Sequence, residues 1–337
     1  MSDAPARSRP KPAAAPLHYR IEAADLHAHL FRVTLTIAQP AAVQQVSLPV
    51  WIPGSYLVRE FSKNLQRLVA RQEGRAVALQ QLDKCNWQVD CVPSSPLVLS
   101  YEVYAFDNSV RTAWLDTQRG FFNGTSLCLR VHGQETLAHA LELVPGKAIA
   151  HWEAATGLAS HKVDKRGFGM YLAGDYDELV DCPVEMGSFW SARFKAGGIP
   201  HRLVVAGASE SFDSARLLAD TQKICEAELR FWHGRAPRRS PHKSYLFMLN
   251  VVDDGYGGLE HRNSTALIAS RRDLPRLGDA RMGEGYLTLL GLISHEYFHT
   301  WNVKQLRPAE FTHYDYTREN YTPVSYTHLT LPTNREV

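Results

Sequence analysis

Long apolar runs are missing from this sequence. The most apolar stretch, residues 286–293, is interrupted by Thr288 and Gly291 and is much shorter than the roughly 18 residues that a membrane helix needs. The first 16 residues are rich in alanine, proline and basic residues, but they lack the apolar segment of a secretory signal. We therefore expect a disordered leader over residues 1–16, no membrane partner and a cytoplasmic location.

Paired cysteines and an excess of charge are also missing. The five cysteines are odd in number and show no C-x-x-C spacing, which predicts neither a disulfide framework nor a cysteine metal site. The formal net charge is only +2, and no basic stripe is interleaved with aromatic residues, so nucleic acid is not an expected partner. With 337 residues, 45% of them hydrophobic, the chain is long enough for about two domains with proper cores.

Period-two alternation marks the first half of the chain. Phe31, Val33, Leu35 and Ile37 alternate with polar residues, which is typical of a half-buried strand. Similar runs occur at residues 97–106, 127–131 and 141–144. Turn dipeptides separate these runs and no long amphipathic helix intervenes. The pattern predicts an antiparallel β-rich domain over residues 17–181.

The second half, residues 182–322, mixes helix and strand, so the fold class is α+β. Leu218, Cys225, Leu229 and Trp232 fall on one helical face, with Ser211 or Asp213 as N-cap and Gly234 as the C-terminal stop. Residues 245–252 form a continuous apolar run that predicts a buried strand, and this strand leads into a glycine-rich turn at 253–258.

The most informative segment is His295-Glu296-Tyr297-Phe298-His299, which fits the pattern H-E-x-x-H. Residues four apart share one face of a helix, so both imidazoles can point at one metal ion. Glu296 then lies where a carboxylate can take a proton from a zinc-bound water. The apolar run that precedes the motif is continuous with it, which favours a buried active-site helix over a chance match.

Three stretches resemble one family. The segment from His295 to Lys304 continues into R-E-N-Y-T at 318–322, L-P-V-W-I-P-G-S-Y occupies 48–56, and G-G-L-E-H-R-N-S occupies 257–264. Together they are similar to the M61 metallopeptidases, the glycyl aminopeptidases of the gluzincin group. The resemblance implies an N-terminal β-rich domain followed by a thermolysin-like α/β zinc-peptidase domain. It also implies Zn²⁺ as cofactor, peptides with a free N-terminus as substrates, and glycine or alanine as the residue removed.

The resemblance further implies a substrate-binding role for Glu260, with Gly257 and Gly258. In related gluzincins the glutamate of the G-x-x-E segment holds the free α-amino group of the substrate, on an edge strand beside the cleft. A carboxylate at a fixed distance from the metal would select substrates that carry a cation there. The alternative is a plain surface carboxylate that follows a glycine turn.

The third zinc ligand is not evident. The family places it in an E-G-F-T-like segment beyond Thr322, and that segment is not present. Residues 323–337 contain two prolines and no helical period, and we interpret them as a non-native tail. Glu319, 20 residues past His299, is the in-chain alternative. We expect a chain truncated before this ligand, the transition-state-stabilising residue and a PDZ-like domain, and therefore inactive as given.

Other features receive no catalytic role. The turn from Pro53 to Tyr56, with Arg59, is read as a connection between strands, and His261 and His313 as ordinary polar histidines. Two other functions stay open: a catalytically silent protein-binding module, and a zinc ester or epoxide hydrolase. Metal content, the effect of Glu296→Ala and a panel of aminoacyl amides against esters would separate them. The oligomeric state stays open.

Overall fold

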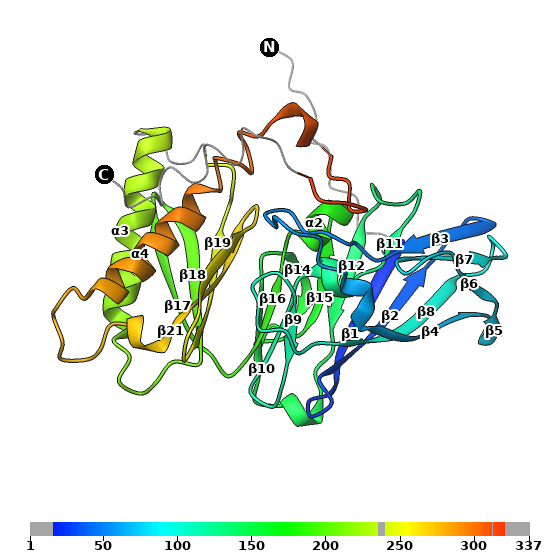
Figure 1. Cartoon of the computed structure of the whole chain (residues 1–337), viewed down its shortest axis with the longest axis horizontal. Coiled ribbons are helices and arrows are strands. Elements are labelled where there is room, and N and C mark those ends of the chain that lie inside the picture. Colours follow the sequence, from blue (N-terminus) through cyan, green and yellow to red (C-terminus); the bar gives the residue numbers. More distant parts are fainter. Residues whose placement is uncertain (1–15, 235–239, 312, 321–337) are drawn as a thin grey trace, which may run out of the picture.

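The computed structural model describes residues 16–234, 240–311 and 313–320. It contains two domains side by side, a β-rich N-terminal domain and a second domain in which a sheet carries two long helices (Figure 1). All five cysteines are free. Within the described residues, every helix is too short or too polar to cross a membrane.

Three sheets build the N-terminal domain. The eight-stranded sheet has the order β14 (Ala159–Val163), β15 (Gly169–Ala173), β12 (His139–Leu143), β1 (Leu17–Asp25), β2 (Leu30–Ile37), β8 (Leu97–Tyr104), β4 (Leu65–Gln72) and β5 (Arg75–Val77). One four-stranded sheet has the order β13 (Glu153–Thr156), β16 (Val184–Gly187), β10 (Arg119–Phe122) and β9 (Ala113–Leu115). The other has the order β11 (Arg130–Val131), β3 (Val43–Ser47), β7 (Asn86–Asp90) and β6 (Leu79–Gln81).

The alternation predicted at residues 31–37 forms β2. Phe31, Val33, Leu35 and Ile37 are fully buried, while the residues between them face outward. In the pairing with β8, Val33 lies opposite Tyr101 and Leu35 opposite Leu99, so one face of both strands enters the same core. Neighbouring strands of the eight-stranded sheet are antiparallel, except for β1 and β12, which are parallel.

The second domain is a five-stranded sheet with both helices on one face (Figure 1). Its order is β17 (Trp190–Ala196), β18 (Ile199–Ala206), β19 (Tyr245–Val252), β21 (Ser264–Ser270) and β20 (Tyr256–Glu260). The three central strands are parallel and the two edges are antiparallel. The helices are α3 (Ser214–His233), which connects β18 to β19, and α4 (Glu284–Phe298), which follows β21.

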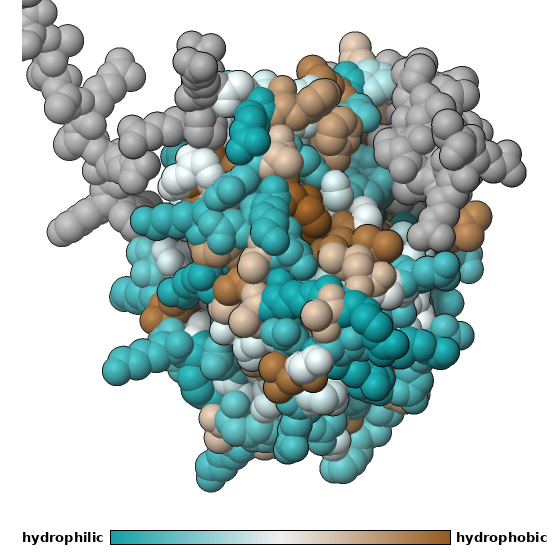
Figure 2. Space-filling view, turned by 90° about the vertical axis from the view of Figure 1, so that its left-hand side faces the viewer, coloured by the Kyte–Doolittle hydropathy of each residue, from teal (hydrophilic) through white to brown (hydrophobic). Residues whose placement is uncertain are grey.

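Both ends of α3 match the sequence prediction. The Asp213 side chain accepts a hydrogen bond from the Arg216 amide at the N-terminus, and Gly234 ends the helix with a φ of 56°. Cys225 and Leu229 are buried in the core, Leu218 and Trp232 pack against it as partly buried residues, and Leu217 is fully buried beside them. Hydrophobic side chains also interrupt the polar surface on the side of the molecule that carries α3 and α4 (Figure 2). On these helices Phe231 and Leu287 are exposed.

The other face of the second sheet packs against the N-terminal domain. Leu259 of β20 and Ala266 of β21 belong to the hydrophobic core of that domain. Ala155 of β13 packs with Val204, Leu246 and Met248. The edge strand β20 therefore lies at the junction of the two domains.

Three expectations need correction. The strand β16 pairs with β10 and β13, so the N-terminal sheets extend past the expected boundary at Asp181. Residues 253–258 are not all turn, because Tyr256–Glu260 pairs with β21 as an edge strand. Residues 127–131 are not one strand, because the helical turn α1 (Gly124–Leu127) precedes the short β11.

Tyrosine hydroxyls explain the irregular backbone after α1. Tyr101, Tyr176 and Tyr19 donate to the carbonyl oxygens of Leu127, Cys128 and Leu129, at 2.5, 2.8 and 2.7 Å. These buried carbonyls obtain from side chains the hydrogen bonds that a neighbouring strand would otherwise supply. A second short helix, α2 (Tyr176–Val180), packs beside α1 and ends at Asp181.

Candidate active site

The two motif histidines meet at the C-terminal end of α4. The helix ends at Phe298, and His299 is its C-cap residue, yet its backbone is still helical, with φ −62° and ψ −15°. The spacing of four residues therefore keeps the two side chains on one face. Their Nε2 atoms lie 3.0 Å apart.

The surroundings leave both of these nitrogens available as ligands. His299 Nδ1 lies 2.7 Å from the carbonyl oxygen of Asn302, which can only accept, so Nδ1 carries a hydrogen and the neutral ring has its lone pair on Nε2. Burial, helped by His299, lowers the pKa of His295 to about 4, so this ring is neutral at pH 7. Two bonds of about 2.05 Å at a tetrahedral zinc would place two nitrogens about 3.3 Å apart, close to the distance seen here.

Glu296 is buried beside this pair. Its side chain is only 4% exposed, and its Oε2 atom has no hydrogen-bond partner among the described residues. Burial, followed by the charge of Glu260, raises the pKa of Glu296 well above its ordinary value. A buried carboxyl with one unpartnered oxygen and a raised pKa holds a proton more readily than an exposed carboxyl does.

Glu260, the last residue of β20, has the opposite balance. Burial by itself would raise the pKa of Glu260. The charges of His299 and Lys304 act in the opposite direction and outweigh it, so the pKa lies below its ordinary value. Ligand atoms of Glu260, Glu296 and His299 all lie within 4.8 Å of one another. The site therefore combines one carboxyl that favours protonation with one that favours ionisation, as expected when two carboxyls share a small space.

The N-terminal domain covers the other side of the site. A β-carbon on Gly54 would lie 3.0 and 3.1 Å from the two Glu260 oxygens, so the Pro53-to-Tyr56 turn is in contact with this carboxylate. The turn is held by Trp51, whose Nε1 donates to the Ser55 carbonyl at 2.7 Å. Arg59 donates from Nε to Ser55 Oγ at 2.8 Å. Reading this segment as a mere connection was wrong, because it forms a wall of the site.

Arg111 is a second residue from the N-terminal domain that sequence reasoning missed. It lies between β8 and β9, and its Nη2 donates to the carbonyl oxygen of Gly258 at 3.2 Å. Burial and the charge of Glu260 raise the pKa of Glu296, and the charge of Arg111 partly offsets this by lowering it. No local pattern distinguishes this arginine, whereas the signal for the turn at Gly54 was its place in the family-like stretch at 48–56.

These groups enclose a cavity of about 120 Å³, lined also by Val303 and Tyr314 from the segment after α4. This is small beside ligand pockets of about 300–1,000 Å³. A larger cavity of about 720 Å³ lies elsewhere between the domains, near Asn108 and Asn250, but no histidine is among its described lining residues.

Of the other predicted residues that the structure describes, only Gly258 lies within the site. Gly258 faces Glu296, whereas the nearest neighbour that a β-carbon on Gly257 would meet is Ile268, 3.7 Å away. Glu319 is exposed and does not line the cavity, although its neighbour Asn320 does. His313 is exposed, and His261 is bonded to Asp181. Thr322, where the expected third ligand would follow, and residues 323–337 lie outside the described residues.

Comparison with known proteins adds independent findings. The sequence model of the peptidase M61 N-terminal domain matches residues 18–188, and that of the M61 glycyl aminopeptidase matches residues 288–328. No curated protein matches the chain. Among solved structures, an aminopeptidase N family protein from Idiomarina loihiensis is 43% identical with a TM-score of 0.87, over 91% of this chain and 51% of its own. The present chain thus spans about half the length of that relative.

A more distant solved structure shares only the fold. Aminopeptidase A from Legionella pneumophila, solved in complex with aspartic acid, is 10% identical with a TM-score of 0.51, over 85% of this chain and 34% of its own.

Proposed function

The chain belongs to the M61 peptidase family, and from that premise we propose that it supplies the active site of a zinc-dependent aminopeptidase. The substrates in this proposal are peptides with a free N-terminus, and the residue removed is small, glycine or alanine. The observation that carries the proposal is the convergence of two imidazole nitrogens, 3.0 Å apart, beside a buried glutamate with an unpartnered oxygen.

The residues present suit zinc. His295 and His299 would hold the ion, and the Asn302 carbonyl orients the second ring, as partners of metal-ligating histidines commonly do. Zinc bound there supplies a Lewis acid that polarises a carbonyl group and lowers the pKa of a water molecule. Catalytic sites use three protein ligands, and we place the third outside the described residues, because Glu319 is exposed and does not line the cavity.

Glu296 would handle the proton. Its carboxylate accepts the proton of the attacking water, and its raised pKa lets it deliver that proton to the nitrogen of the departing peptide. Burial between α4 and β20 keeps bulk water from competing for this transfer.

Glu260 would bind the substrate's α-ammonium group. Its lowered pKa keeps it ionised. Its ligand atom lies within 4.8 Å of those of Glu296 and His299, so an amine bound to Glu260 would be only one residue away from the scissile bond. The contact with the Gly54 turn and the cavity of about 120 Å³ leave little room for a first side chain, which supports a preference for glycine or alanine.

The proposal is tested by kinetics of the full-length gene product on matched substrates, glycyl amides with a free or an acetylated N-terminus. Glu296→Gln keeps the shape but removes the base, and should lower turnover by about 10²-fold or more. Glu260→Ala should cost about 2–4 kcal/mol in kcat/KM for free-amine substrates and far less for acetylated ones. Undiminished turnover in the first variant, or equal losses on both substrates in the second, would contradict these roles.

A further inference from the structure

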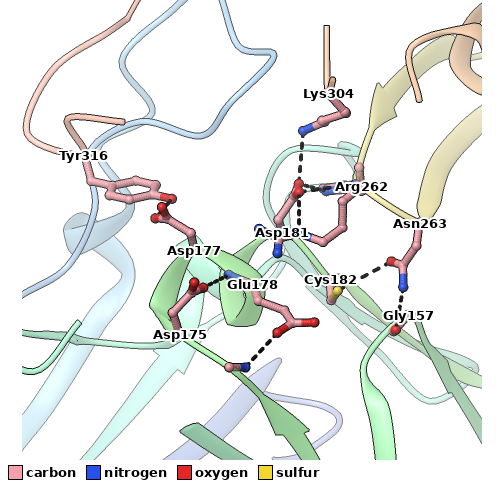
Figure 3. A network of polar contacts seen from close by, with 12 residues as sticks. Gly157, Asp175, Asp177, Glu178, Asp181, Cys182, Arg262, Asn263, Lys304 and Tyr316 are labelled. Carbon is pink, nitrogen blue, oxygen red and sulfur yellow. Dashed lines mark hydrogen bonds and ion pairs between the residues drawn. The ribbon is translucent and has the colours of Figure 1, made fainter. Parts of the chain in front are cut away.

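One buried carboxylate, Asp181, joins the N-terminal domain to both sides of the active site (Figure 3). It accepts from His261 Nδ1 at 3.0 Å, from the Arg262 side chain at 3.1 Å and from Lys304 Nζ at 3.0 Å. The Arg262 backbone amide donates to it as well, at 3.2 Å. The proposed function assigns no role to this cluster.

The partners of Asp181 come from the two segments that carry the site. His261 and Arg262 directly follow Glu260 at the end of β20. Lys304 follows α4, and its amide donates to the carbonyl oxygen of His299. Asp181 itself ends α2, so a single side chain of the N-terminal domain holds the end of the Glu260 strand and the turn after the second histidine.

The anchor on the N-terminal side is itself well held. The Asp175 side chain caps α2, and the Tyr316 hydroxyl donates to Asp177 Oδ1 at 2.7 Å (Figure 3). Asn263 adds a second link between the domains by donating to the Gly157 carbonyl at 2.8 Å. Displacement of Asp181 is therefore opposed from both domains.

The central ion pair of this cluster, between Lys304 and Asp181, has little contact with solvent, whereas the Arg262 side chain is 37% exposed. The side chains of Lys304 and Asp181 are 5% and 13% exposed. Burial raises the pKa of Asp181, but Lys304, His261 and Arg262 outweigh it and hold the pKa well below its usual range. The ammonium group of Lys304 also acts on Glu260, whose carboxylate it stabilises. Without Asp181, the ammonium group of Lys304 would be drawn to Glu260, the other carboxylate whose charge acts on it, because an unpaired buried charge is costly.

We propose that Asp181 is a positioning residue that keeps Lys304 away from Glu260, so that the Glu260 carboxylate stays open for the α-ammonium group of the substrate. This proposal rests on the amine-binding role of Glu260. Lys304 carries the same kind of cation as the substrate's N-terminus, and its pairing with Asp181 prevents it from occupying the substrate's place. The hydrogen bonds from His261 and Arg262 to Asp181 also fix the position of the end of β20, where Glu260 lies.

The role predicts a specific kinetic pattern. In Asp181→Asn, Lys304 loses its counter-charge and competes for Glu260, so KM for free-amine glycyl substrates should rise about tenfold or more, with a much smaller change in kcat. Zinc content should be unchanged. In the double variant Asp181→Asn with Lys304→Met the competitor is gone, and KM should return to within about threefold of the native value.

The experiment measures KM, kcat, zinc content and thermal unfolding for the full-length gene product and these two variants. Asn108→Ala is the matched control, because it removes a hydrogen bond to Asn250 at the domain junction, at the larger cavity and not at the site. It should leave KM unchanged. If Asp181→Asn does not fold, the double variant carries the test.

Four results would overturn the proposal. A fall in kcat and zinc content with unchanged KM in Asp181→Asn would mark a merely structural role. A double variant whose KM remains tenfold raised would exclude competition by Lys304. If Glu260→Ala itself leaves KM for free-amine substrates unchanged, the amine-binding function fails and the proposal fails with it. If only Glu260→Ala raises KM, the function stands and the role of Asp181 does not.

Discussion

Gly258 on β20 and Glu296 on α4 pack so closely that a β-carbon on the glycine would overlap the glutamate carboxyl. The carbonyl oxygen of the same glycine accepts from Arg111, so strand, helix and N-terminal domain meet at one residue. The missing side chain is therefore what allows the carboxyl of Glu296 to lie against β20.

Gly258→Ala should displace Glu296 and lower turnover by about 10²-fold or more, comparable to loss of the general base. Zinc content should persist, because the three atoms nearest to the new β-carbon all belong to Glu296 and not to a histidine. Gly291→Ala is the control on α4. A β-carbon there meets nothing within 4 Å, so activity should stay native and the helix should gain about 0.5–1 kcal/mol. Native turnover in Gly258→Ala would refute the close fit.

Gly54→Ala should weaken binding of free-amine substrates. The residue has a φ of +87°, and its new β-carbon would lie 2.6 Å from Leu259 Cδ1 and about 3 Å from the Glu260 carboxylate. We expect KM to rise several-fold. Gly74→Ala imposes similar backbone strain, with a φ of +77° and nothing within 4 Å, so it should cost about 1 kcal/mol of stability and leave KM unchanged. Equal KM values in the two variants would show that the turn at Gly54 does not contribute to substrate binding.

Glu228 should make the protein less stable as the pH rises. Burial raises the pKa of Glu228 to about 8, although a hydrogen bond from Ser294 acts to lower it. In the unfolded chain the same carboxyl has a pKa near 4.5. Its neutral form is thus favoured in the fold, and the stability that this confers is complete below pH 4.5 and is lost as the pH rises to about 8.

Glu228→Gln should remove this loss. The variant should equal the native protein near pH 4 and exceed it at pH 8 by a few kcal/mol at most, on the order of 1–4. Thermal or denaturant unfolding at both pH values measures the difference. Glu210→Gln, at an exposed position, should show no such pH-dependent gain. A variant less stable than native at pH 8 would contradict the assignment.

Local sequence patterns predicted those helices and strands whose formation depends on residues close together in the chain. The alternation at Phe31 to Ile37 became β2, and Asp213 and Gly234 limit α3, because caps and periodicity act within a few residues. The pair of glycines in β20 was read as turn from its composition, but this segment pairs as a hairpin with β21, which begins at Ser264.

Residue spacing alone predicted the candidate site only where one helix supplies it, and Glu260 was predicted from the family resemblance at 257–264. His295, Glu296 and His299 follow from helical spacing alone. Arg111, the turn at Gly54 and Asp181 come from the other domain, and no spacing in the sequence records that the two domains meet at β20. These residues become visible only through tertiary packing, which a single sequence does not display.

The most direct test of the central claim is the metal content of the purified full-length gene product, measured together with aminopeptidase rate before and after chelation. We predict about one zinc per chain, loss of activity on chelation and recovery on adding zinc, with both zinc and activity lost in His299→Ala. Metal content near zero together with undiminished cleavage of glycyl substrates would contradict the account.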